Sequence, residues 1–156
     1  MFRWFGYVSH VSATKVAGFA AHLKDGRIMA SRCLACGARA FPPRADCERC
    51  RGGRFEFVEL SGRGVLHTFT TIAAAPTGFE DRTPYTLGVV DLEEGGRALA
   101  EFGAGFSADD IRIGLAVQLV PRLVEESEDI HVIYTIERAG ATWSRAERDA
   151  IGSAQP

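Results

Sequence analysis

Long hydrophobic runs are absent from this 156-residue sequence. No segment approaches the roughly 18 consecutive apolar residues that a membrane-spanning helix needs, so no membrane role is expected. The first residues, MFRWFGYVSH, contain neither the apolar core nor the cleavage site of a signal peptide. We therefore expect a cytoplasmic protein. Thiols stay reduced in that compartment, so disulfides are not expected.

Familiar catalytic and nucleotide-binding motifs are also absent. The sequence has no G-x-S-x-G, no P-loop and no G-x-G-x-x-G. None of its four histidines stands in a metal motif. Two of them, His67 and His131, lie in strand-like segments, where a histidine is more often packed or exposed than catalytic. We predict that the protein has no catalytic residue of its own, and we expect a binding or accessory module.

Lysine is scarce, with two residues against 16 arginines, and the net charge is −2. A general nucleic-acid binder would be clearly basic. Between residues 27 and 54, however, seven arginines meet only two acids, Asp46 and Glu48, which leaves an excess of five positive charges. This zone is either a solvated face or a site for an anion, because guanidinium groups fit phosphate oxygens.

All four cysteines lie in residues 33–50, as the pairs Cys33/Cys36 and Cys47/Cys50. Two C-x-x-C turns that face each other form the four-sulfur cage of a zinc ribbon. So short a segment buries no useful core, and structural zinc can supply about 10–16 kcal/mol of apparent stability. Zinc is the favoured metal, and iron in a rubredoxin-like site is the alternative. Four cysteines fill the coordination shell, which leaves no position for a catalytic water.

The segment 1–31 is aromatic at its start and then helical in pattern. Val16, Phe19, Ala20 and Leu23 follow helical spacing. Ser12 is a possible cap at the start, and Gly26 is a possible end. The apolar face of this helix must pack on the later part of the chain or on another protein.

The remainder reads as strands. Short segments rich in β-branched and aromatic residues alternate with turns that contain Gly, Pro or Asp. They begin at residues 55, 64, 85, 97, 116 and 131. Segment 104–114 is expected to be a loop with one helical turn, capped by Asp109 and Asp110. Closure of a small sheet removes its edges, and a five-stranded OB-type barrel fits this size better than a sandwich of about seven strands.

These patterns predict a mainly β fold class with an N-terminal helix. A rubredoxin-like zinc ribbon at 32–53 is followed by a five-stranded OB-fold barrel at 54–137 and a C-terminal tail at 138–156. Trp143 is unusual in a tail, because a large aromatic side chain normally has a surface to bury against.

A combination of motifs over about residues 15–137 resembles the thiolase-associated zinc-ribbon/OB-fold family. The motifs are Cys33-x-x-Cys36-Gly37, Phe41-Pro42-Pro43-Arg44, Cys47-x-x-Cys50, Ser61-Gly62-Arg63-Gly64 and Pro84-Tyr85 before a strand. The resemblance implies a non-catalytic subunit of a thiolase complex that cleaves a 3-oxoacyl-CoA with CoA. One relative is the small subunit of benzoylsuccinyl-CoA thiolase of anaerobic toluene degradation. Other relatives accompany an aldolase, a hydratase or a synthase.

The resemblance also suggests roles for particular residues. Arg39 and Arg44 are expected to meet the phosphates of CoA. The aromatic residues Phe2, Trp4, Phe5, Phe19 and Phe41 are expected at the interface with a catalytic subunit in a hetero-oligomer, since aromatic anchors are common at interfaces. The alternative from another class is an OB-fold protein that binds single-stranded nucleic acid. The many acids of the barrel zone disfavour it.

Overall fold

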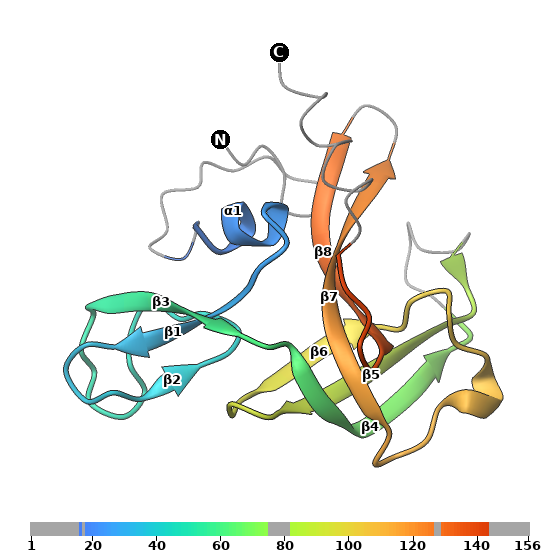
Figure 1. Cartoon of the computed structure of the whole chain (residues 1–156), viewed down its shortest axis with the longest axis horizontal. Helices are drawn as coiled ribbons and strands as arrows, with labels where there is room; N and C mark the ends of the chain where they lie inside the picture. Colours follow the sequence, from blue (N-terminus) through green and yellow to red (C-terminus); the bar gives the residue numbers. More distant parts are fainter. Residues whose placement is uncertain (1–15, 17, 75–81, 127–128, 144–156) are drawn as a thin grey trace.

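A ribbon and a barrel lie side by side in the computed structural model, which describes residues 16, 18–74, 82–126 and 129–143 (Figure 1). The ribbon is a three-stranded antiparallel sheet in the order β2-β1-β3. Its strands are β1 (Ile28–Cys33), β2 (Arg39–Ala40) and β3 (Phe55–Leu60). Because Cys33 pairs with Phe55, the cysteine segment forms the connection between two paired strands, β1 and β3.

The barrel is a five-stranded antiparallel sheet in the order β6-β5-β4-β7-β8. Its strands are β4 (Arg63–Ile72), β5 (Tyr85–Leu92), β6 (Arg97–Glu101), β7 (Ala116–Glu126) and β8 (Asp129–Arg138). A parallel bridge between Phe102 and Ile136 brings the end of β6 to β8 and nearly closes the sheet. The predicted fold class is therefore confirmed.

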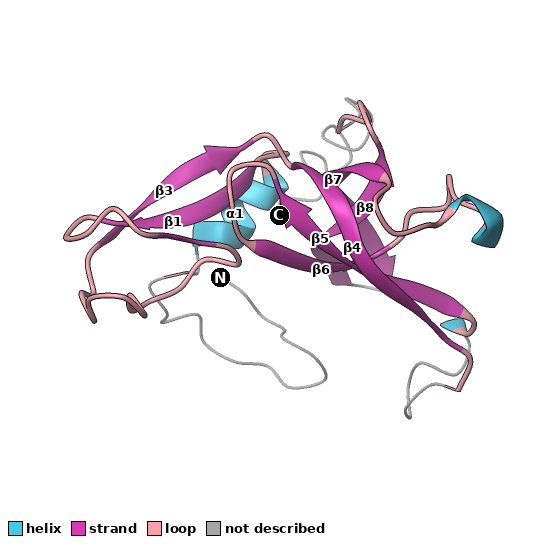
Figure 2. Cartoon of the chain, turned by 90° about the horizontal axis from the view of Figure 1, so that it is seen from below, coloured by secondary structure: helices cyan, strands magenta, loops and turns pink. Residues whose placement is uncertain are grey.

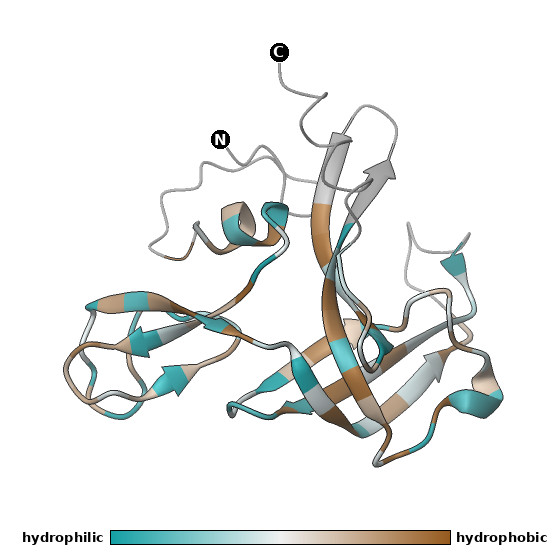
Figure 3. Ribbon diagram, in the orientation of Figure 1, coloured by the Kyte–Doolittle hydropathy of each residue, from teal (hydrophilic) through white to brown (hydrophobic). Residues whose placement is uncertain are grey.

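The barrel core follows the alternation of the strands. Leu66, Val90, Val117, Leu119 and Ile136 are fully buried, and hydrophobic and hydrophilic residues alternate along the strands in Figure 3. Gly88 on β5 leaves room for this core, since a Cβ atom there would lie 2.7 Å from the Ile136 side chain and 2.8 Å from Phe102.

One short helix, α1 (Gly18–Lys24), lies against β1, β7 and β8 (Figures 1 and 2). Leu23 is buried, and the Phe19 ring packs edge-on against Phe41 and Tyr134. The helix ends just before Gly26, which has a φ of 77°. Its apolar face thus packs on the chain itself. The predicted cap, Ser12, lies outside the described residues, as does most of the tail.

Two other expectations concern the loops. The turn expected in segment 104–114 is the 3-10 helix η2 (Ala108–Asp110). The sequence left open what Trp143 packs on. In the structure its ring packs against Gly26. No helix in the described part of the chain combines the length and the apolar character that crossing a membrane requires.

Candidate metal centre and the ribbon surface

The four cysteine sulfurs gather at one end of the ribbon. The Sγ atoms of Cys33 and Cys50 are 3.5 Å apart, those of Cys36 and Cys47 are 3.6 Å apart, and all four lie within 4.8 Å of one another. Zinc–sulfur bonds of about 2.3 Å in a tetrahedron separate the sulfurs by about 3.8 Å. The donor set and its spacing are therefore consistent with structural zinc, as the sequence predicted.

Both C-x-x-C turns have the same backbone pattern. The Gly37 amide donates to the Cys33 carbonyl at 2.9 Å, and the Arg51 amide donates to the Cys47 carbonyl at 2.8 Å. Each first cysteine also donates its own amide, Cys33 to Ala38 at 2.8 Å and Cys47 to Gly52 at 3.0 Å. Gly37 and Arg51 hold equivalent positions, with φ of 72° and 59°.

The electrostatics of the cluster show why it favours a cation. The backbone amides of Cys36 and Ala35 lower the pKa of the Cys33 thiol to about 7, and those of Cys50 and Arg49 lower the pKa of Cys47. The Gly52 amide acts in the same direction on Cys50, but the neighbouring Cys36 and Cys33 thiols outweigh it and raise the pKa of Cys50 to about 12. Four thiolates at this spacing repel one another unless a metal ion neutralises them.

The two arginines expected at CoA phosphates differ in their surroundings. Arg39 is exposed on β2, and its guanidinium has no partner among the described residues. Arg44 forms an ion pair with Glu48 on the ribbon. Arg32 is likewise held by Glu56, with Nε 2.7 Å from the carboxylate. Part of the positive charge seen in the sequence is thus balanced within the ribbon.

The barrel arginines are also balanced by acids. Arg63 pairs with Glu93 at 2.9 Å, Arg82 with Glu101 at 2.7 Å and Arg138 with Asp110 at 2.8 Å. Such pairs leave fewer free cations for a nucleic-acid backbone on the described barrel surface.

The residues expected at a partner interface fall into two groups. Phe2, Trp4 and Phe5 lie outside the described residues. Phe41 is only 5% exposed, and its ring packs on Tyr134 with a centroid distance of 5.7 Å. Together with Phe19 it joins the ribbon, α1 and the barrel from inside. The interface role of these five aromatics stays a prediction.

Comparisons with known proteins match both halves of the structure. Residues 20–56 match the family described as "ChsH2, rubredoxin-like zinc ribbon domain". Residues 57–122 match "ChsH2, C-terminal OB-fold domain". A "DUF35 domain-containing scaffold protein" of Methanocaldococcus jannaschii is 35% identical over 114 residues, which cover 72% of this chain and 80% of that protein. The chain belongs to the DUF35/ChsH2 zinc-ribbon and OB-fold scaffold family.

Two further members of this scaffold family carry more specific descriptions. "Benzoylsuccinyl-CoA thiolase subunit BbsA" of Thauera aromatica is 36% identical over 111 residues, which cover 67% of this chain and 72% of that protein. The solved structure "Ltp2-ChsH2(DUF35) aldolase" contains a chain that matches with a TM-score of 0.64 and 25% identity. The match covers 81% of this scaffold-family chain and 98% of the other.

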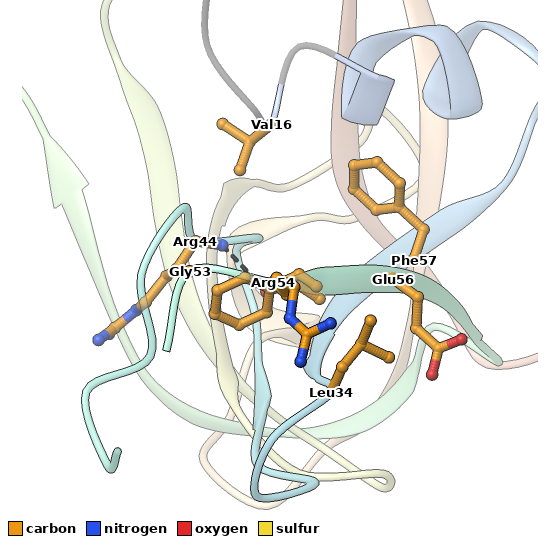
Figure 4. A pocket seen from close by; sticks show the side chains of 9 residues that line it. Val16, Leu34, Arg44, Gly53, Arg54, Glu56 and Phe57 are labelled. Carbon is orange, nitrogen blue, oxygen red and sulfur yellow. Dashed lines mark hydrogen bonds between the residues drawn. The ribbon is translucent and has the colours of Figure 1, made fainter. Parts of the chain in front are cut away.

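One feature of this DUF35/ChsH2 scaffold was not predicted from its sequence. A cavity on the ribbon is lined in part by Ser31, Leu34 and Arg54 (Figure 4). These residues lie on separate segments, and only the pairing of β1 with β3 brings them together. In the sequence, the only hint of this cavity was Leu34, a large apolar residue between Cys33 and Cys36.

Proposed function

We propose that this chain is a scaffold subunit, without catalytic residues of its own, in a thiolase-type complex that cleaves a 3-oxoacyl-CoA with CoA. The observation that carries the scaffold role, whichever enzyme is the partner, is the match of its ribbon and barrel to a chain of an Ltp2-ChsH2 aldolase over 98% of that chain. The likeness to a benzoylsuccinyl-CoA thiolase subunit supports a thiolase as the partner and makes benzoylsuccinyl-CoA the first substrate to test.

The use of the thiols supports a scaffold role. Thiolase chemistry employs a cysteine nucleophile, and all four cysteines of this chain gather in one cluster. In the proposed assembly the partner supplies the nucleophile. Zinc held by Cys33, Cys36, Cys47 and Cys50 makes the ribbon rigid, which allows it to meet the partner without further ordering.

Binding of CoA belongs to the same proposal. Arg39 has no ion-pair partner in the described part of the chain, whereas Arg44 must exchange Glu48 for a CoA phosphate. Such an exchange costs little, because Arg44 and Glu48 form an exposed pair, and exposed ion pairs contribute about 0–1 kcal/mol. The aromatic residues Phe2, Trp4 and Phe5 are proposed to contact the catalytic subunit.

An aldolase is the second candidate for the partner, because the matched solved structure is described as an aldolase. Co-purification of the chain from its native host identifies the partner directly. The purified complex is then assayed for CoA-dependent cleavage of benzoylsuccinyl-CoA and for retro-aldol cleavage of a 3-hydroxyacyl-CoA. Cleavage by the complex but not by the isolated chain is expected. Thiolytic activity of the isolated chain would overturn the scaffold proposal.

The CoA contact has its own test. A complex that carries both Arg39→Ala and Arg44→Ala should have a KM for the CoA ester about tenfold higher than the parent complex. The reason is that charge-assisted hydrogen bonds to phosphate are worth about 1.5–3 kcal/mol. Arg112→Ala removes an exposed arginine far along the sequence and serves as the control. An unchanged KM in the double variant would contradict the phosphate role while leaving the scaffold role intact.

A further inference from the structure

A cavity of about 330 Å³ opens on the ribbon. Of its lining residues, only Arg44 has a part in the proposed function. Its walls come from β1, β3, the first C-x-x-C turn and the segments on either side of the second turn, together with Val16 (Figure 4). The lining includes Val16, Ser31, Leu34, Arg54, Phe55 and Phe57. A volume of this order lies at the small end of the range for ligand pockets in proteins.

Most of the wall is apolar. Phe55 and Phe57 come from β3, and Leu34 is 53% exposed in the first C-x-x-C turn. Single exposed apolar side chains are normal on a protein surface. Here they gather with two aromatic side chains around one concavity, which favours an apolar ligand over a hydrated one.

A buried hydroxyl adds a polar group to the wall. Ser31 is 2% exposed, and its Oγ accepts a hydrogen bond from the Arg44 amide at 3.0 Å. This contact fixes the oxygen, and the hydroxyl proton has no acceptor within the described ranges. Ser31 can therefore donate a hydrogen bond to a ligand.

Arg54 is the charged group that remains available. Its backbone carbonyl accepts the Leu34 amide at 3.0 Å, which fixes the base of the side chain beside the apolar wall. Its guanidinium has no hydrogen-bond or ion-pair partner among the residues that the structure describes. The other charged lining residues are engaged, Glu56 with Arg32 and Arg44 with Glu48, and Figure 4 shows the Arg44 guanidinium pointing away from the cavity.

These groups define the chemistry of the ligand. Ser31 and Arg54 are donors, and the one carboxylate in the lining, Glu56, is already paired. We propose that the cavity binds a small apolar carboxylate, with its hydrocarbon body against Leu34, Phe55 and Phe57. The carboxylate accepts the planar pair of N–H groups of Arg54, a geometry that guanidinium matches well.

The experiment uses the full zinc-loaded chain and three probes. These are 3-phenylpropanoate, 3-phenylpropan-1-ol, which lacks the charge, and acetate, which lacks the apolar body. Amide NMR signals of Leu34, Gly53 and Phe57 report on the cavity. We expect 3-phenylpropanoate to shift them with a dissociation constant of about 1 mM or lower, the range for a ligand of this size. The other two probes should bind at least about tenfold more weakly.

Variants assign the binding to the cavity. Arg54→Ala should weaken 3-phenylpropanoate about tenfold, and Arg54→Lys, which keeps the charge but loses the planar fork, should weaken it less. Arg112→Ala should leave binding unchanged. Equal binding of the alcohol, undiminished binding by Arg54→Ala, or shifts spread away from the ribbon would overturn the proposal. None of these outcomes bears on the partner subunit, so the scaffold role is judged separately.

Discussion

Two residues set the backbone of the metal turns. Gly37 and Arg51 both have a positive φ and occupy the same place in the two turns. A left-handed conformation costs a residue with a Cβ atom about 1–2 kcal/mol, and glycine avoids this cost. The second turn therefore carries strain that the first does not.

Exchange at these two positions gives opposite predictions. Gly37→Ala should lower the free energy of unfolding of the zinc-loaded protein by about 1–2 kcal/mol. Arg51→Gly should raise it by about 0.5 kcal/mol, because relief of strain is partly offset by the greater freedom of glycine in the unfolded chain. Guanidinium unfolding measures both. A loss from Arg51→Gly as large as that from Gly37→Ala would contradict the assignment.

The Asp110 carboxylate holds together the loop before β7. Its carboxylate accepts the Ser107 amide at 2.9 Å and the Ser107 hydroxyl at 2.8 Å, and it pairs with Arg138. The Ser107 amide is the main cause that lowers the pKa of Asp110, with further help from the Ser107 hydroxyl and Arg138.

The sign of the pH effect follows from that lowered pKa. The stabilisation by Asp110 is present above the unfolded-state pKa of about 3.9, and it is lost as the pH falls through the lower folded-state pKa. Asp110→Asn should thus be less stable than the parent at pH 7, with a difference that shrinks below about pH 4. Urea unfolding across this range measures it. Asp109→Asn, one residue away, is the matched control.

At the level of the elements, the cysteine segment of the ribbon is the part that we expect to depend on a metal. Within the cysteine segment, β2 consists of Arg39 and Ala40 alone, and between residues 34 and 54 only Phe41 belongs to the buried hydrophobic core. The barrel strands, in contrast, supply most of that core, including Leu66, Val90 and Ile136. The two parts should therefore respond differently to loss of zinc.

Removal of one sulfur tests this difference. Cys36→Ser should bind less zinc and lose the ordered amide signals of the segment 33–55, because structural zinc contributes about 10–16 kcal/mol of apparent stability. The barrel signals should persist. Metal analysis and amide NMR measure both effects. Ala35→Ser in the same turn is the matched control, and loss of zinc from that variant would contradict a specific role for the thiol.

The strands differ in how well the sequence predicts them. The strand-like segments that begin at residues 55, 85 and 116 match the starts of β3, β5 and β7, because alternation of apolar and polar residues reports a sheet with one buried face. β1 was not predicted. Most of its residues are buried, so its sequence, IMASRC, does not alternate.

At the scale of the whole molecule, Phe41 connects the parts. It lies on the ribbon, packs on Phe19 of α1 and Tyr134 of β8, and its Cβ atom lies 3.2 Å from where a Cβ on Gly96 would be. From the sequence, this ring was expected at an interface with a catalytic subunit. Only the folded arrangement shows that the barrel is near enough to cover it.

Truncation of this ring tests the connection. Phe41→Ala should cost about 3–5 kcal/mol, typical of a large buried aromatic, and should make the ribbon and the barrel unfold separately. Leu99→Ala, at a site 60% exposed on β6, should change stability by less than about 0.5 kcal/mol. Calorimetry measures both. A single, unshifted transition for Phe41→Ala would show that the ring does not couple the parts.

The candidate sites were also unequally predictable. Two C-x-x-C pairs identify the metal ligands, because this spacing alone brings both thiols of a pair to one point. The cavity could not be predicted in this way. Ser31, Leu34 and Arg54 have no shared motif, and they meet through the register of β1 and β3.

The ribbon order β2-β1-β3 has one more consequence, which concerns self-association. β3 is an edge strand, so one side of its backbone is not paired with a neighbouring strand. An exposed edge is a template for strands of other copies, and charged side chains oppose such pairing. Glu56 and Glu59 stand exposed on this edge. A strand of another copy that paired here would lie beside these two carboxylates, which disfavours such aggregation.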